Sequence, residues 1–454
     1  MQSDSPIVPA LLRLGLPTML VLLVQTGVGL AETWFVSFLG TTALTAAALV
    51  FPAYMLMTMM ANGGIGGGVA SAIARAIGAG DRARAESFAF HGLVLAVAFG
   101  VIFMLALWMG GAALYSVMGA HGPALTTALA YSNAVFAGAV PVWVAALIGA
   151  ALRGAGEVRF PARVTLVGAI ALLAASPALI FGVGPLPRLE MVGAGVALGL
   201  YFGVAALVLI LYMRSARSPL RLARHRLEWR NFREILGVGG LSAVGTVQAN
   251  LTVALVTGAV GHYATDAIAG YGIASRLDYL LIPLLFGFGT GVVTLVGRSV
   301  GAGRSDRAMR IAWIGAGIAG GTTGLIGLLA AIFAPGWAGI FTSDAAVIAT
   351  TTLYLRTVAP FYGVFGFGMT LYFAGQGARR VGWPIAAGTV RLLVGGVLGA
   401  VAASSLHWPI AGLFALVAAS TVLFGAVIVG ALFLKPWSGT AASPIATSLK
   451  GNPS

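Results

Sequence analysis

Apolar stretches long enough to cross a bilayer recur along this 454-residue chain. A membrane-spanning helix needs about 20 consecutive apolar residues, because each residue adds only about 1.5 Å of length. Only 8% of the residues are charged, whereas soluble domains carry about 25%, so a soluble enzyme, a disordered protein and a fibrous repeat are excluded. The sequence therefore predicts an all-α membrane protein with twelve transmembrane helices, at residues 12–35, 44–72, 90–114, 125–151, 160–181, 192–213, 234–260, 267–295, 311–334, 346–374, 384–404 and 409–434.

The basic residues are distributed unequally between the two sides of the predicted membrane. With the N-terminus inside, 22 of the 26 Lys and Arg residues fall in inner loops or tails, and only Arg188 falls outside. Cytoplasmic loops hold such an excess because basic segments resist translocation. We therefore expect a multi-pass protein of a bacterial inner membrane with both termini cytoplasmic. The net charge of +14 is then a matter of topology and of contact with membrane lipid, and no nucleic-acid partner is expected.

The chain contains an internal repeat at a constant shift of 223 residues. ARAIGAGDRARA at 74–85 faces GRSVGAGRSDRA at 297–308, and the same shift pairs Tyr131 with Tyr354. Because each repeat has an even number of spans, the two copies have the same orientation, the parallel arrangement known from transporters. The predicted organisation is an N-terminal six-helix lobe, a basic cytoplasmic linker, a C-terminal six-helix lobe and a disordered tail, at 1–213, 214–233, 234–435 and 436–454.

Several motifs appear in a fixed order along the chain. They are GLAETWFVSFLG, GAGDRARAES with its copy GAGRSDRA, RGAGEVRFP and YLRTVAP, which begin at residues 29, 78, 301, 153 and 354. In order, spacing and duplication they resemble the multidrug and toxic compound extrusion (MATE) family, and within it a proton-coupled, DinF-like bacterial branch. The resemblance implies two six-helix bundles facing each other in a V, without enzymatic activity. It also implies export of amphipathic, often cationic, small organic compounds. The oligomeric state is open, with a monomer as the default, and we expect no cofactor.

Glu32 is the only acidic residue in the membrane part of the first half, toward the outer end of the first span. A carboxylate is costly in hydrocarbon, so it should face a cavity or a partner. The resembled family has an aspartate at the matching place, where it takes part in proton or sodium coupling. We expect Glu32 to exchange a proton in competition with a cationic substrate. The alternative is a carboxylate in interfacial water without a function.

Four further charged residues lie within the predicted spans of the second half, and they form the candidate second-lobe ionic or substrate site. Arg276 and Asp278 are two residues apart on one helix and therefore point to different faces. We expect Asp278 to pair instead with another helix, through Arg356 or Arg391. Such a pair either locks the bundle or forms a second coupling or substrate site.

Neutral polar residues complete the predicted cavity lining. Gln25, Tyr131 and Asn133 join Glu32 as candidates for cation coupling, with Tyr131 and Asn133 as possible hydrogen-bond partners of its carboxylate, and Gln248 and Asn250 join the second-lobe set. Each amide alone is more typical of a hydrogen bond between helices. Sodium-using members of the resembled family carry acids in spans 7 and 10, and this chain has none there, which favours protons over sodium as the coupling ion.

Two glycine runs, NGGIGGG at 62–68 and GFGTG at 287–291, precede the duplicated arginine loops. Neither is a phosphate-binding loop, because no Lys occurs before residue 435, so we expect them to serve close helix packing. The duplicated loops themselves are either a latch of ion pairs or simple helix caps. Scattered His residues indicate no metal site. A lipid-linked saccharide flippase and a sodium-coupled exporter are the alternatives to a proton-coupled exporter, and a membrane-embedded enzyme would need a reactive constellation that the sequence lacks.

Overall fold

The computed structural model describes residues 6–183, 187–263 and 265–434, and nearly all of them are helical. The predicted tail, 436–454, lies outside the described residues. The first half contains α1 (Ile7–Ser37), α2 (Thr41–Met59), η1 (Met60–Ile65), α3 (Gly66–Gly78), α4 (Arg82–Val117), α5 (Gly122–Ala137), α6 (Ala139–Gly154), α7 (Arg159–Phe181) and α8 (Glu190–Arg214). The second half contains α9 (Trp229–Val260), α10 (Thr265–Gly301), α11 (Ser305–Ile332), α12 (Ala334–Gly339), α13 (Ala345–Val358), η2 (Ala359–Phe361), α14 (Tyr362–Gly377), α15 (Gly382–Arg391), η3 (Leu392–Leu398), α16 (Gly399–Ser404) and α17 (Ile410–Leu434).

The predicted all-α membrane architecture is confirmed. Within the described residues, 11 helices are long and apolar enough to span a membrane, and the bent pair α5 and α6 brings the number to 12. That pair is bent by 42° just before Pro141, and a short 3₁₀ turn, η2, forms at Pro360. Both irregularities occur where a proline interrupts the backbone hydrogen-bond ladder. Two π-helical turns, η1 and η3, break other spans without a proline.

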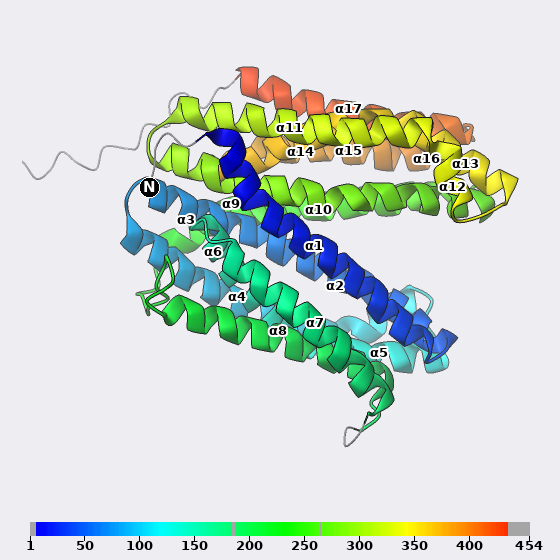
Figure 1. The fold of residues 1–454 in the computed structure, drawn as a ribbon. Helices are drawn as coiled ribbons and strands as arrows, with labels where there is room; N and C mark the ends of the chain where they lie inside the picture. The colour runs from blue at the N-terminus through cyan, green and yellow to red at the C-terminus, as the bar shows by residue number, and fades with distance from the viewer. Residues whose placement is uncertain (1–5, 184–186, 264, 435–454) are drawn as a thin grey trace, which may run out of the picture.

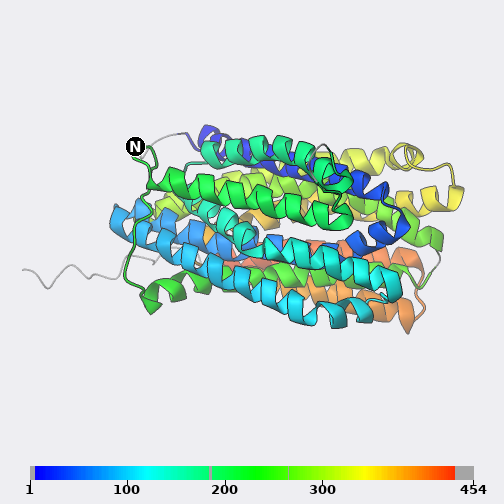
Figure 2. The ribbon, with the colours of Figure 1, turned by 90° about the horizontal axis from the view of Figure 1, so that it is seen from below.

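The helices form two bundles that converge at one end of the molecule and diverge at the other (Figure 1). The end at which they converge carries the loops that follow α3, α6, α8, α10 and α14, which are rich in arginine, and we call it the basic end. Figure 2 shows the long helices of both bundles running in one overall direction, as the spans of a single membrane do. The segment Ser215–Glu228 connects α8 to α9 across the basic end, so α9 begins within the predicted linker.

Glycines bring the two bundles into contact at the basic end. A Cβ on Gly78 would overlap the carbonyl oxygen of Arg298, and a Cβ on Gly301 would overlap that of Arg75. The glycine run 62–68 continues this contact, because Gly64 lies against Ala243 and Gly68 lies against Ile235 and Gly239 of α9. The predicted role of small residues in close helix approach is therefore confirmed.

Helix α1 contacts both bundles. Its N-terminal part packs on α10, where Gly15 and Gly287 lie backbone to backbone, and its C-terminal part packs on α7. Pro17 lies between these two parts, inside the helix. The second glycine run, 287–291, therefore serves the packing of α1 on the second bundle as well as the packing of α10 on Phe373 of α14.

Candidate functional site

The acidic residue of the first bundle, Glu32, lies near the C-terminal end of α1 and faces α7. The Ser176 hydroxyl on α7 donates a hydrogen bond to Glu32 Oε2 at 2.8 Å. The other carboxylate oxygen, Oε1, is buried and has no hydrogen-bond partner. The expected alternative, a carboxylate already in open water, does not fit this environment, because water would satisfy both oxygens.

Tyrosines surround Glu32 on helices other than its own. Tyr54 on α2 and Tyr131 on α5 lie close enough to interact electrostatically with its carboxylate. Tyr201 on α8 lies near Gln25 on α1 and Thr165 on α7. Five helices therefore contribute polar groups to one cluster in the first bundle, which we call the Glu32 cluster (Glu32, Ser176, Tyr54, Tyr131, Tyr201, Gln25 and Thr165).

The predicted coupling set is only partly brought together. Tyr131 and Gln25 lie in the Glu32 cluster, whereas Asn133 is exposed, and only its backbone carbonyl takes part in a bond, from the Trp108 indole at 3.2 Å. The hydrogen-bond donor to Glu32 is Ser176, not Tyr131 or Asn133. Sequence reasoning missed Ser176 because a single serine in an apolar span carries no signal of what it faces.

The acidic residue of the second bundle, Asp278 on α10, is held by two tyrosines. Tyr354 on α13 donates a hydrogen bond to Asp278 Oδ2 at 2.7 Å, and Tyr362 on α14 donates to Oδ1. Arg391 on α15 lies near enough to interact electrostatically with the carboxylate but forms no salt bridge with it. Its guanidinium lies over the Phe365 ring at 4.6 Å, and its buried Nε has no hydrogen-bond partner.

The expected partner of Asp278 was an arginine, and the structure supplies tyrosines instead. A hydroxyl donor satisfies a carboxylate without bringing a second charge into the bundle, which avoids a further desolvation cost. The internal repeat contained a signal for this arrangement. Tyr354 is the repeat counterpart of Tyr131, and each of the two tyrosines lies beside the acid of its own bundle.

The remaining predicted residues lie apart from this acid. Arg276 points to a different face of α10 from Asp278, as its spacing predicts, and stacks over Phe341 at 5.0 Å. Arg356 is exposed on α13. The Gln248 amide donates to the Thr389 hydroxyl at 2.8 Å and so links α9 to α15, which is the role expected of such an amide. Asn250 is exposed and donates to the carbonyl of Thr246 in its own helix at 2.9 Å.

At the basic end, each bundle hydrogen-bonds the end of a helix in the other. The Ser71 hydroxyl on α3 donates to the carbonyl of Gln376, and its repeat counterpart Thr294 on α10 donates to the carbonyl of Arg153 at 3.0 Å. Arg75 donates to the carbonyl of Gly377 at 3.3 Å, and Arg298 donates to that of Ala155. Arginines favour these positions because the carbonyls at a helix C-terminus carry partial negative charge.

We call these contacts between the bundles at the basic end the clasp. A carboxylate from the start of α9 completes it. Glu234 accepts hydrogen bonds from Arg75 at 3.2 Å and from Arg84 at 2.8 Å. Asp81, in the first duplicated loop, caps α4 by accepting from the backbone N–H of Arg84 at 2.9 Å. The first duplicated loop is therefore part of an ion-pair latch and a helix cap at once, and the acid of the latch comes from the second half of the chain.

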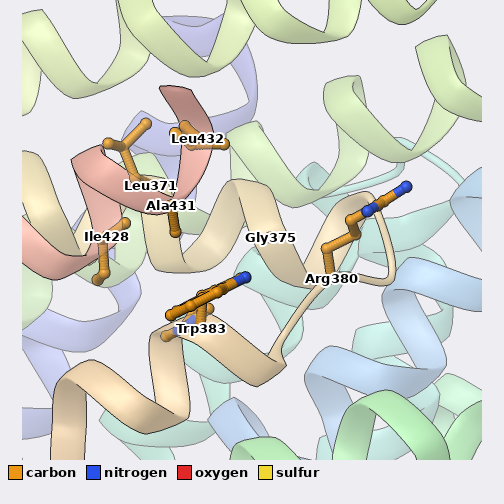
Figure 3. Close-up of a pocket in the computed structure, with 8 residues that line it drawn as sticks. Leu371, Gly375, Arg380, Trp383, Ile428, Ala431 and Leu432 are labelled. Carbon is orange, nitrogen blue, oxygen red and sulfur yellow. The ribbon is translucent and has the colours of Figure 1, made fainter. Parts of the chain in front are cut away.

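Two pockets lie toward the basic end. One is lined by Leu371, Gly375, Arg380, Trp383, Pro384, Ile428, Ala431 and Leu432 and lies on the second bundle, with the Arg380 side chain extending away from Leu371 and Leu432 (Figure 3). The other lies where the bundles meet and is lined by residues of both halves, among them Asn62, Arg153, Phe286 and Gln376. Within the described ranges, no group of three or more His, Asp or Glu side chains is arranged to hold a metal ion.

Comparison with known proteins identifies the family of this chain. The family model described as MatE matches residues 17–177 and 242–401, one match in each half of the chain. The FAD transporter of Shewanella oneidensis is 29% identical over 376 residues, which is 80% of this chain and 80% of that protein. The probable multidrug resistance protein NorM of Deinococcus radiodurans is 28% identical over 453 residues, 95% of this chain and 96% of that one.

Solved structures agree with the fold. A MOP superfamily transporter from Pyrococcus furiosus superposes with a TM-score of 0.85 at 24% identity, over 93% of this chain and 96% of that chain. The outward-facing structure of a multidrug resistance MATE family transporter superposes with a TM-score of 0.84 at 24% identity, over 94% of each chain. The family predicted from the motifs is confirmed: this chain belongs to the MatE family of multidrug efflux transporters, and it is a multi-pass membrane transporter and not an enzyme.

Proposed function

We propose that this protein is a secondary antiporter that exports amphipathic, cationic organic compounds in exchange for protons. The observation that carries the proposal is the setting of Glu32. Its carboxylate lies within a membrane span, has one hydrogen-bond donor and one free oxygen, and pairs with no Lys or Arg of the described chain. Such a group can hold a proton or a cationic compound, so that binding of one releases the other.

The arrangement of the bundles supports alternating access. By the positive-inside rule the basic end is cytoplasmic. The bundles meet there through the Glu234 clasp, and their helices diverge toward the other end (Figure 1), so the clasp holds the cytoplasmic end closed. Rocking of the two parallel repeats against each other would open the clasp and close the outer end.

The acidic residues of the second bundle favour protons over sodium as the coupling ion. The sodium-using members of the family carry acids in spans 7 and 10, where this chain has Gln248, Asn250 and Arg356. The one intramembrane acid of this bundle, Asp278, has both oxygens occupied by tyrosine hydroxyls. A hard cation needs several free oxygen ligands, and the Asp278 carboxylate offers none, because both of its oxygens accept tyrosine hydrogen bonds.

The alternatives differ in substrate. A lipid-linked saccharide flippase needs a cradle of arginines for pyrophosphate, but Arg276, Arg356 and Arg391 have different surroundings: a phenylalanine ring, the exposed surface, and the Asp278 cluster. The similarity to the FAD transporter of Shewanella oneidensis favours a flavin nucleotide as a second candidate substrate. Either substrate class is compatible with a monomeric exporter in a bacterial inner membrane.

Dye transport in everted membrane vesicles tests the proposal. An imposed pH gradient, with the lumen acidic, should drive ethidium uptake by the wild-type protein, and an imposed sodium gradient alone should not. Glu32→Gln should abolish uptake at equal expression, whereas Glu190→Gln, whose carboxylate is exposed beside Arg188, should transport normally. Uptake that depends on sodium, or normal uptake by Glu32→Gln, would overturn the proposed coupling, and no uptake of any cation would overturn the substrate class.

A further inference from the structure

The pocket where the two bundles meet contains one charged side chain, that of Arg153. Thr290, which also lines it, lies 11 residues before the end of α10, or about 16 Å along the helix from the basic end. The pocket therefore lies between the two bundles, farther from the basic end than the clasp. Phe286 and Phe373 form an apolar wall, with ring centroids 5.2 Å apart.

Arg153 reaches this pocket because of the direction in which helical side chains lean. It lies in the last turn of α6, and its terminal nitrogen lies beside Gly149, one turn earlier, where an added Cβ would be 3.2 Å away. Side chains of a helix lean toward its N-terminus, so the guanidinium is drawn from the basic end toward the junction. Gly149 leaves the space that this path requires.

The Arg153 guanidinium has no counter-charge. In the part of the chain that the structure describes, it takes part in no ion pair and no side-chain hydrogen bond, and no acidic side chain is close enough to interact with it. The other interfacial arginines differ, since Arg75 binds Glu234 and a helix end, and Arg298 binds a helix end. The Arg153 side chain is half-buried between the bundles, and a guanidinium at membrane depth is stabilised by a group of opposite charge.

The internal repeat shows that packing does not require this charge. The shift of 223 residues places Gln376 opposite Arg153, and both side chains line the pocket. The Gln376 amide is neutral and donates to the carbonyl of Gly63 at 3.1 Å, the Ser242 hydroxyl at 2.9 Å and the Tyr372 hydroxyl at 3.2 Å. One half of the chain therefore fills this position with a neutral group that bonds its neighbours, and the other half places an unpaired charge there.

We propose that this pocket binds an oxyanion, the phosphate or carboxylate group of an amphipathic compound, on Arg153. The planar guanidinium fork matches two oxygens of such a group, and the two phenylalanine rings line the pocket beside it. The inference rests on the proposed export function and extends its substrate class to compounds that carry a negative group. The same oxyanion chemistry has a second source in an anionic lipid headgroup.

Riboflavin and flavin mononucleotide are suitable probes, because they differ by a single phosphate. Binding to the purified full-length protein is measured by flavin fluorescence for the wild type, Arg153→Gln, Arg153→Lys and the matched control Arg163→Gln, an exposed arginine at the start of α7. The wild type should bind the phosphorylated flavin about tenfold or more tightly than riboflavin, and Arg153→Gln should lose that preference. Arg153→Lys should keep part of it, because it keeps the charge but loses the fork.

Three results would overturn the inference: no preference for the phosphate in the wild type, an equal loss for both flavins in Arg153→Gln, or the same loss in Arg163→Gln. Repeating the titration in nanodiscs of neutral lipid and of phosphatidylglycerol identifies the source of the oxyanion. If phosphatidylglycerol weakens flavin nucleotide binding in the wild type but not in Arg153→Gln, a lipid headgroup occupies the pocket. If it has no effect, the site belongs to the substrate. If the protein transports ethidium but does not prefer flavin mononucleotide over riboflavin, this inference is wrong and the proposed function stands. If it prefers flavin mononucleotide but transports no ethidium, the proposed function is wrong and this inference stands.

Discussion

The carboxylate of Glu234 connects the two bundles at the basic end, so its removal should favour the conformation in which that end is open. The Arg75–Glu234 pair is well buried, with side chains 11% and 13% exposed, and a hydrogen bond between charged groups contributes about 1.5–3 kcal/mol. Arg84 is 40% exposed, and solvent screening limits its pair to about 0–1 kcal/mol. Glu234→Gln should therefore shift the equilibrium by about 1.5–4 kcal/mol, or about 10- to 1000-fold.

A shift of this size is measurable. If the basic end is open in about one molecule in a hundred of the wild type, it should be open in about a tenth or more of the Glu234→Gln molecules. The chain contains no Cys, so two introduced cysteines are its only labelling sites. Spin labels at Ala83 on α4 and Arg310 on α11, both exposed near the basic end, report the separation of the bundles by pulsed electron resonance.

The matched control is Glu228→Gln, an exposed carboxylate six residues earlier, at the end of the segment that leads into α9. It should leave the distance distribution unchanged. Arg84→Gln should have a smaller effect than Glu234→Gln, because Arg84 is the more exposed partner. A distribution in Glu234→Gln that matches the wild type, or an equal change in Glu228→Gln, would refute the assignment of the clasp.

Two other substitutions test the packing and the second acid. Gly78→Val should abolish transport while the protein still reaches the membrane, because the added side chain overlaps the Arg298 carbonyl and keeps the basic end from closing; Gly110→Val, in open space, should transport normally in the same vesicle assay. Tyr354→Phe should lower the free energy of unfolding by about 1.5–3 kcal/mol, because it removes a hydrogen bond to the buried Asp278 carboxylate, as measured by thermal unfolding in detergent. Tyr279→Phe, an exposed neighbour on α10, should have no effect, and an equal loss in both variants would contradict the role assigned to Tyr354.

The charged residues of the candidate site could be predicted from the sequence, but their hydrogen-bond partners could not. Glu32 and Asp278 stand out in the sequence because a charge in an apolar span is rare and costly. Their partners do not stand out. Ser176 lies 144 residues from Glu32, and Tyr362 lies 84 residues from Asp278, and a lone hydroxyl in an apolar segment is unremarkable by itself. The repeat pairs Tyr354 with Tyr131, and this was the one sign of these partners in the sequence. It indicated that the two tyrosines occupy equivalent positions, not that each contacts an acid.

The amino-acid sequence by itself determines the number of spans, the two-fold repeat and the family of this protein. Apolar length, glycine runs and the order of motifs are properties of the chain that can be read without knowing what packs on what. Only the tertiary structure decides that Glu234 closes the basic end, that α1 packs on both bundles, and that Arg153 enters a pocket without a counter-charge. The reason is that a hydrogen bond or an unpaired charge depends on which helix faces which, and in this protein that is decided by contacts between residues from opposite halves of the chain.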